Sequence, residues 1–155
     1  MKITALFFGV FAGCLSCIPA HAADYLWNGG NGSWTDSGAW RLDDSSADWS
    51  NGNTAQFQTD SSITVGSGIS ASGMLYNGAA ITLNGGSLTL TGAAAGNNGG
   101  SATLSNTGLI LDAPNAEDSY EVRDTSLTGS ATLAKTGAGT VTLDGAHTAS
   151  GVWNI

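Results

Sequence analysis

A tripeptide of an apolar residue, threonine and leucine recurs along this chain and limits what it can fold into. It occurs five times, at 81–83, 88–90, 102–104, 131–133 and 141–143. Side chains alternate between the two faces of a strand, so the apolar residue and the leucine share one face. Threonine is β-branched and suits the opposite, exposed face. Most copies are bounded by Gly or Asn, as at Asn84-Gly85-Gly86, which predicts short strands between tight turns.

Glycine is spread along the chain and argues against helices. There are 23 glycines in 155 residues, and no segment places apolar residues at helical spacing over three turns. Each glycine in a helix interior would cost about 1 kcal/mol. Further strands are predicted at 63–65, 74–76, 109–111 and 120–123, and the stretch from Gly92 to Gly100 is predicted to form turns.

The irregular spacing of these strands bears on the choice between two all-β architectures, a meander and a solenoid. A meander of β-hairpins is one answer. A β-solenoid fits better, because its coils stack short strands, hold aliphatic side chains in inward rows and turn at small residues. We therefore expect a solenoid over residues 61–155, with inward-facing leucines at Leu83, Leu90, Leu104, Leu133 and Leu143.

The first 22 residues have the pattern of a secretory signal peptide. Lys2 supplies a positive start, residues 3–13 are apolar, and Ala20-His21-Ala22 is a small-x-small cleavage site. We expect export through the Sec pathway, cleavage after Ala22 and no transmembrane helix, because the apolar run is shorter than the roughly 20 residues that a span needs. Phe11-Ala12-Gly13-Cys14 also resembles a lipobox, which leaves lipidation of Cys14 as an alternative.

Residues 23–60 differ from the rest in composition. They contain Trp27, Trp34, Trp40 and Trp49, four of the five tryptophans, together with six aspartates. Because the first coil of a solenoid has no preceding neighbour, we expect these tryptophans to cap its open end. The alternative is that they are ligand-facing aromatics, stacked on sugar rings.

The acidic residues of this region suggest a second candidate site. Calcium binds several oxygen ligands from a flexible loop, and Asp43, Asp44, Asp48, Asn51 and Asn53 lie close together in sequence. The spacing of an EF-hand and the nonapeptide calcium repeat are both absent, so a solvated loop is the preferred interpretation. We assign no metal ligands and no cofactor.

Charge and catalytic residue types argue against nucleic-acid binding and against enzymatic activity. Twelve acids against four bases give a net charge of −8, the opposite of what phosphate recognition requires. Outside the signal the basic residues are Arg41, Arg123 and Lys135, and His147 has no Ser or Cys partner that would form a triad. Both cysteines, Cys14 and Cys17, lie in the signal segment. We therefore assign no catalytic residues.

Residues 133–155 closely resemble the autotransporter-associated β-strand repeat. The pattern of that family is approximately Leu-x-Lys-x-Gly-x-Gly-Thr-Leu-x-Leu-x-Gly-x-Asn-x-Tyr-x-Gly-x-Thr-x-Ile. Nine residues here meet it, with Val141 in place of a leucine: Leu133, Lys135, Gly137, Gly139, Thr140, Leu143, Gly145, Gly151 and Ile155. His147, Ala149 and Trp153 depart from it, where asparagine, tyrosine and threonine are usual. The tryptophan-rich segment resembles the start of many passengers in this family. The resemblance implies a right-handed parallel β-helix delivered to the surface of Gram-negative bacteria, with the repeat assisting folding and transport.

Two functions follow as expectations. The first is an exported structural or surface-display segment, which could also serve adhesion, at the cell surface or outside the cell. Its partners would be a translocator barrel or further passenger coils absent from this chain, and it would be periplasmic if truncated without them. The alternative is a secreted carbohydrate-binding or polysaccharide-active module. The last coil, ending at Ile155, would present an unpaired edge and a site for end-to-end self-association.

Overall fold

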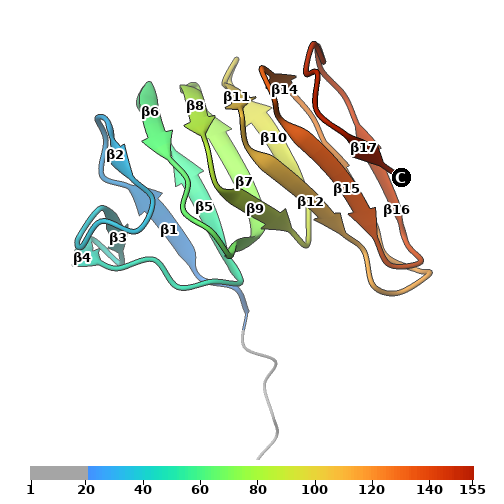
Figure 1. Cartoon of the computed structure of the whole chain (residues 1–155). Helices are drawn as coiled ribbons and strands as arrows, with labels where there is room; N and C mark the ends of the chain where they lie inside the picture. The colour runs from blue at the N-terminus through green and yellow to red at the C-terminus, as the bar shows by residue number, and fades with distance from the viewer. Residues whose placement is uncertain (1–20) are drawn as a thin grey trace, which may run out of the picture.

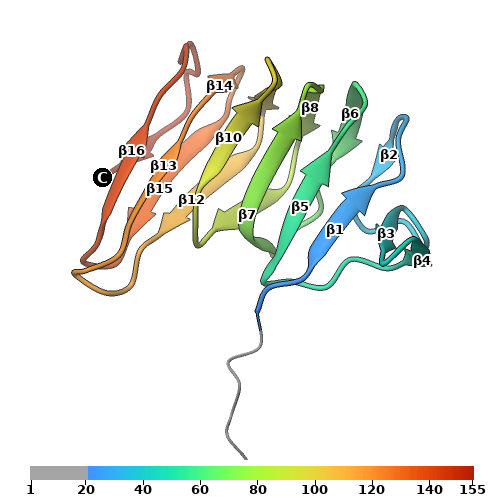
Figure 2. The same ribbon diagram turned by 180° about the vertical axis from the view of Figure 1, so that it is seen from behind.

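Parallel strands wind into a β-solenoid of about five turns, seen from opposite sides in Figures 1 and 2. The structure is a computed structural model and describes residues 21–155. No helix occurs within that range, so the predicted all-β class is confirmed. The predicted signal-peptide cleavage and the lipobox alternative rest mainly on residues outside the described range and stay predictions.

The coils build three parallel ladders, each a face of the solenoid. The first face contains β1 (Asp24–Trp27), β5 (Asn53–Phe57), the second half of β7 (Ile69–Asn77), β10 (Ala94–Asn97), β13 (Ser119–Val122) and β16 (Thr140–Leu143). The second contains β2 (Gly32–Ser33), β6 (Ser61–Thr64), β8 (Ala80–Asn84), β11 (Ser101–Ser105) and β14 (Thr125–Thr128). The third contains the first half of β7, then β9 (Ser87–Leu90), β12 (Gly108–Asp112), β15 (Thr132–Thr136) and β17 (Trp153–Asn154). β7 therefore runs from the third face into the first.

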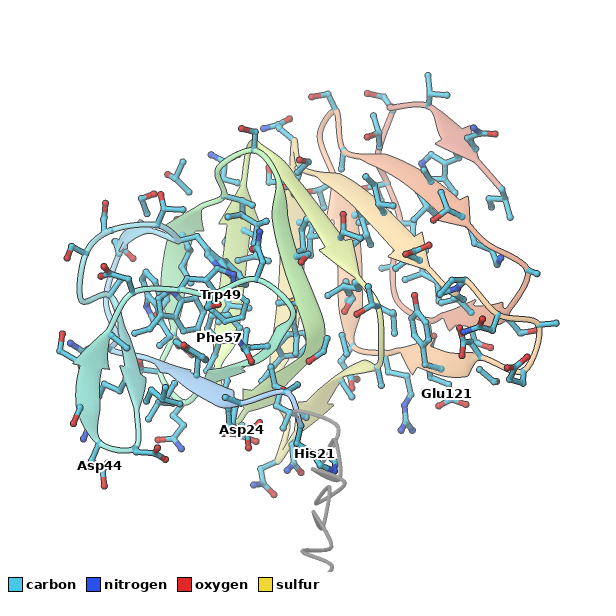
Figure 3. All side chains as sticks on the ribbon, turned by 90° about the horizontal axis from the view of Figure 1, so that it is seen from below. His21, Asp24, Asp44, Trp49, Phe57 and Glu121 are labelled. Atoms are coloured by element: carbon cyan, nitrogen blue, oxygen red, sulfur yellow. The ribbon has the colours of Figure 1, made fainter. Side chains whose placement is uncertain are left out.

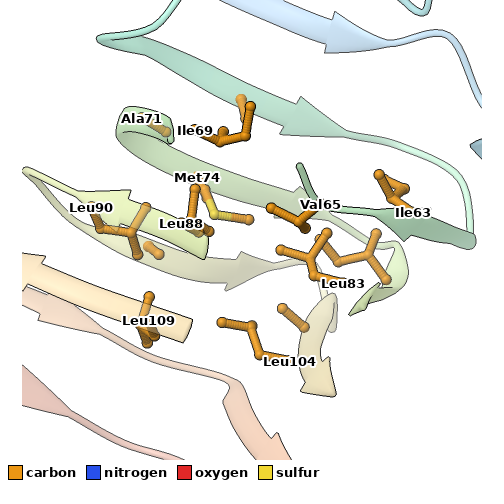
Figure 4. Packing of buried hydrophobic residues seen from close by; sticks show 14 of the residues in the cluster. Ile63, Val65, Ile69, Ala71, Met74, Leu83, Leu88, Leu90, Leu104 and Leu109 are labelled. Carbon is orange, nitrogen blue, oxygen red and sulfur yellow. The ribbon is translucent and has the colours of Figure 1, made fainter. Parts of the chain in front are cut away.

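In-register pairing stacks the apolar residues into continuous inward rows. On the second face Ile63, Leu83, Leu104 and Leu127 pair in sequence, and on the third face Leu88, Leu109 and Leu133 do so. All seven side chains are buried, and Figure 4 shows part of this packing. Full burial of such a side chain contributes roughly 1.5–3 kcal/mol, so the rows are the main source of stability.

The predicted inward leucines are confirmed with one difference. Leu83, Leu90, Leu104 and Leu133 are at most 4% exposed. Leu143 faces the core from β16 but is only half-buried, because β16 pairs with β13 on one side and, among the described residues, with no strand on the other. The four strands predicted outside the tripeptides are found in β6, β7, β12 and β13, although the predicted ranges 63–65 and 120–123 each run one residue past the strand.

The prediction of turns throughout Gly92–Gly100 is wrong. Residues 94–97 form β10, which pairs with β7 on one side and β13 on the other. The strand is needed to continue the first face. A Cβ on Gly96 would lie 2.0 Å from the carbonyl oxygen of Gly100, so the glycines there permit a close corner beside the strand.

An antiparallel hairpin that the sequence analysis did not predict covers the N-terminal edge. β3 (Trp40–Leu42) pairs antiparallel with β1, and β4 (Ser45–Ala47) pairs antiparallel with β3. Asp43 and Asp44 connect them with φ of 49° and 63°, the left-handed backbone typical of a two-residue hairpin turn. The region 23–60, predicted to form the cap, thus contributes both this hairpin and the first strands of the solenoid, β1, β2 and β5.

Candidate functional site

The repeat motif lies across the last two coils of the solenoid. Leu133 occupies an inward row on β15, between Leu109 of the preceding coil and Trp153 of the last one. Lys135 lies on β15 two residues after Leu133 and pairs with Leu111 of β12. Its ammonium donates hydrogen bonds to the carbonyl oxygens of Gly137, at 2.8 Å, and Thr136, at 3.4 Å. The motif lysine therefore satisfies carbonyls of the corner that leads into the last coil.

The four motif glycines share one geometric property. A Cβ added to any of them would lie much closer than van der Waals contact to a backbone carbonyl oxygen of the preceding coil. The distances are 2.2 Å from Gly137 to Ala113, 2.6 Å from Gly139 to Asn115, 1.9 Å from Gly145 to Thr125 and 2.1 Å from Gly151 to Ala131. Gly137 also has φ of +77°, which side chains disfavour. The motif spacing thus places glycine at four points where the last coil lies close against the backbone before it.

The strand of the motif is held on one side only. Thr140 and Asp144 donate their backbone N–H groups to Asp118 and Val122 on the preceding coil, each at 2.8 Å. Because N–H groups alternate in direction along a strand, those of Val141 and Leu143 point to the opposite, free edge. β17 likewise pairs only with β15 among the described strands.

Three large apolar side chains of the last coil are exposed to solvent. Val152 is 75% exposed, Ile155 is 86% exposed and Trp153 is 40% exposed, and these are the exposed large hydrophobic residues of the range 21–155. His147, a departure from the family pattern, pairs with Leu127 and continues the inward row of the second face. Its ring packs edge-on against Trp153, with centroids 5.5 Å apart. The last coil therefore has the composition of a core layer with one side open.

The tryptophans form an aromatic cluster, Trp27, Trp34, Trp40 and Trp49 with Phe57, at the opposite end. Trp34 and Trp40 are completely buried and Trp27 is 5% exposed. Trp40 lies 4.9 Å from Trp34, 5.1 Å from Trp27 and 4.7 Å from Trp49 between ring centroids. Figure 3 shows Trp49 and Phe57 together at this end. The rings pack against one another as the cap interpretation expects, and only Trp49, half-buried, keeps part of its surface toward solvent.

Four of the five residues considered as calcium ligands make hydrogen bonds or an ion pair with other residues of the chain. Asp48 accepts a hydrogen bond from the Gly38 N–H at 2.9 Å. Asp44 pairs with Arg41 at 2.9 Å beside the hairpin tip, from which it projects in Figure 3. The amides of Asn51 and Asn53 donate to backbone carbonyls of Gly68 and Ser50. These contacts account for the conformation of the loop.

Two tyrosine hydroxyls tie separate coils together, and the sequence analysis did not single them out. The hydroxyl of buried Tyr76 lies 3.1 Å from the Thr125 hydroxyl, two coils further along. Burial raises the pKa of Tyr76 well above its usual range, opposed in part by the hydrogen bond with Thr125. The Tyr120 hydroxyl lies 2.9 Å from the Leu90 carbonyl oxygen and 3.0 Å from that of Asp112. Burial, with the negative charges of Asp112 and Asp118, raises the pKa of Tyr120 to about 12.

Residues 21–155 contain no detectable pocket and no group of three or more His, Cys, Asp or Glu side chains placed to share a metal ion. In the same range no helix has the length and apolar character that a membrane crossing requires. Comparison of the chain with protein-family models, with curated proteins and with solved structures finds no match.

Proposed function

We propose that this chain is an exported structural segment of the autotransporter-passenger kind, whose last coils support folding and transport of the passenger. The observation that carries the proposal is the fit of the four motif glycines against the backbone of the preceding coil. A motif with this spacing would serve to stack one coil closely on the coil before it.

Transport of an unfolded chain requires that the chain fold again after crossing the envelope. A chain that crosses an envelope unfolded must regain its structure on the far side, and each new coil needs a template on which to form hydrogen bonds and bury its apolar row. We propose that the chain is delivered through the Sec pathway, is displayed at or beyond the cell surface, and works with a translocator barrel or further coils. We assign it no catalytic role.

The export step is tested by mass spectrometry of the secreted protein. The proposal predicts a mature chain that begins at Ala23. A diacylglyceryl group on Cys14 would instead make this a lipoprotein and overturn the proposed route.

The role of the last coil is tested by surface display. The chain is joined after residue 155 to a translocator barrel, and the fraction reaching the cell surface is measured by protease accessibility. Gly139→Ala and Gly145→Ala should each lower that fraction several-fold, because both glycines lie against backbone oxygens. The matched control is Gly66→Ala, since the nearest atom to a Cβ there is the Thr35 methyl carbon at 3.9 Å.

Two results would contradict the proposal. One is full display of the Gly139 and Gly145 variants under conditions where their last coil is disordered. The other is strong binding to a glycan array that is lost in Trp34→Ala while the fold persists, which would favour the carbohydrate-binding alternative.

A further inference from the structure

Asparagine followed by glycine is a chemically reactive pair, and the fold treats the copies in this chain differently. Asparagine is a thermolabile residue, because the backbone nitrogen of the next residue can attack its side-chain carbonyl carbon. Glycine in that next position hinders the attack least, since it has no Cβ. The chain contains six such pairs, which begin at Asn28, Asn31, Asn51, Asn77, Asn84 and Asn98. The reacting groups are the same in all six, so the structure around each pair must distinguish them.

The pair at Asn51 is held by both of its reacting groups. The Asn51 Oδ1 accepts hydrogen bonds from the Ser70 N–H and the Trp49 indole N–H, each at 3.0 Å. The N–H of Gly52 donates to the Ser70 carbonyl oxygen at 3.1 Å. Attack would require these hydrogen bonds to break first, so this pair is protected by the fold.

Three further pairs are held in similar ways. At Asn77 and Asn84 the N–H of the following glycine donates to a carbonyl oxygen of the next coil, that of Asn97 at 2.6 Å and that of Ser105 at 3.1 Å. The Asn31 Oδ1 accepts a backbone N–H of β6 at 2.9 Å. Four of the six pairs therefore need a local opening of the solenoid before they can react.

The pair at Asn98 is at the tip of the tight turn that joins β10 to β11 (Figure 1). Asn98 and Gly99 have φ of 53° and 84°, and the Gly100 N–H donates to the Asn97 carbonyl oxygen at 3.2 Å. These are features of a two-residue type I′ turn. Both tip residues are exposed, and in the described part of the chain neither the Asn98 side chain nor the Gly99 N–H makes a hydrogen bond.

The sixth pair, at Asn28, is intermediate. Its side chain and the N–H of Gly29 also make no hydrogen bond within residues 21–155, but the N–H of Asn28 itself donates to the Ala39 carbonyl oxygen at 2.9 Å. The backbone of Asn28 is thus tied to the capped edge, whereas the N–H of Asn98 has no such partner among the described residues. The tip at Asn98 is the least restrained of the six pairs.

We propose that Asn98 is a site of spontaneous deamidation in the folded protein, and that it reacts before the other five pairs. The Gly99 nitrogen loses its proton and forms a bond to the Asn98 Cγ, and the side-chain nitrogen leaves as ammonia. The product of this step is a succinimide ring. Water then adds to one of the two ring carbonyls and breaks its bond to nitrogen, which leaves aspartate or isoaspartate in place of Asn98.

The surroundings of the turn allow this change without loss of the fold. β10 is paired on both sides, and Gly100 is packed so closely that a Cβ there would lie 1.5 Å from the Tyr76 carbonyl oxygen. The reaction therefore alters the exposed tip and leaves the paired strand beside it. It also adds a carboxylate to a corner where Asp124 already accepts the Gly96 N–H at 3.0 Å, so the protein acquires a more acidic form.

The experiment is incubation of the exported protein at mildly alkaline pH in water labelled with heavy oxygen, followed by proteolysis and fragment mass spectrometry. Label should enter first at Asn98, at least about tenfold faster than at Asn51, Asn77 or Asn84, because those pairs react only after local opening. In guanidinium chloride the six rates should converge. Asn98→Gln is the matched variant: it keeps the amide on a longer side chain, so label there should be lost while labelling of Asn28 is unchanged.

Isoelectric focusing supplies a second readout, in which the wild type should accumulate a more acidic band faster than Asn98→Gln does. The proposal is overturned if any other pair reacts as fast as Asn98 in the folded protein, or if Asn98 takes up no label. It is equally overturned if the preference for Asn98 persists in guanidinium chloride, because the local sequence and not the fold would then select the site.

Discussion

The first and last coils belong to the same solenoid, yet they are stabilised in different ways. The first coil has its edge covered by the β3–β4 hairpin and its core filled by five aromatic rings, Trp27, Trp34, Trp40, Trp49 and Phe57. The last coil has a free edge, half-buried Val141 and Leu143, and exposed Val152 and Ile155. A solenoid is a one-dimensional stack in which each coil depends on its neighbours, so a closed end should resist opening and an open end should fray.

The largest expected difference between the two ends concerns tryptophan. Trp40→Ala should lower the free energy of unfolding by about 3–5 kcal/mol, the usual cost of removing a buried aromatic side chain. The variant also loses the 2.8 Å hydrogen bond from the Trp40 indole to the Trp34 carbonyl. Urea unfolding followed by circular dichroism measures the change.

The matched variant at the other end is Trp153→Ala, where the side chain is 40% exposed. It should cost about 1–2 kcal/mol, less than Trp40→Ala, because a smaller apolar area is withdrawn from water. Equal losses in the two variants would mean that the aromatic cluster does not stabilise the capped end.

A smaller difference is expected for leucine. Leu104→Ala, in the middle of the stack, should cost about 2–5 kcal/mol. Leu143→Ala removes the same atoms from a half-buried position in the open coil, so we expect roughly 1 kcal/mol, in proportion to the smaller area withdrawn from water. The same unfolding experiment compares them, and a larger loss for Leu143 would contradict the open end.

The smallest effect concerns pH and the interior of the stack. Tyr76 is buried and has a raised folded-state pKa, whereas the unfolded value is about 10. Its neutral form therefore contributes stability that is complete below about pH 10 and is lost as pH rises toward the folded-state pKa.

Comparison of the wild type with Tyr76→Phe at several alkaline pH values tests this contribution. The free energy of unfolding of the variant should fall less steeply between about pH 9 and pH 11. Parallel slopes would show that Tyr76 does not govern the alkaline loss. Tyr120, with a pKa of about 12 and a position nearer the open end, should ionise before Tyr76 in a spectroscopic titration.

The inward rows could be predicted from sequence because strand alternation is local. The tripeptides place their leucines inward whichever face they join, so Leu83, Leu90, Leu104 and Leu133 were predictable without knowing the coil boundaries. The face itself was not predictable: 81–83 and 102–104 lie on the second face, 88–90 and 131–133 on the third, and 141–143 on the first. That assignment depends on corner lengths, such as the longer connection at 113–118.

Features that join distant residues also escaped the sequence analysis. The hairpin turn at Asp43-Asp44 lacks the glycine that marks most two-residue turns, and its strands are three residues each. The contact between Tyr76 and Thr125 spans 49 residues. The glycines around β10 indicated turns, so the strand was not predicted. Its extended backbone is held by pairing with strands on both sides and not by the strand propensity of its residues. Hydrogen bonds between residues distant in sequence determine these three features, and a local sequence pattern does not predict such bonds.

The most direct test of a solenoid whose first coil is covered by the hairpin and whose last strand is paired on one side only is amide hydrogen exchange. The Asn28 amide donates to Ala39 across the capped edge at 2.9 Å. We predict strong protection there, and nearly unprotected exchange for Val141 and Leu143 on the free edge of β16. Protection of Val141 and Leu143 equal to that of Asn28 would contradict the account.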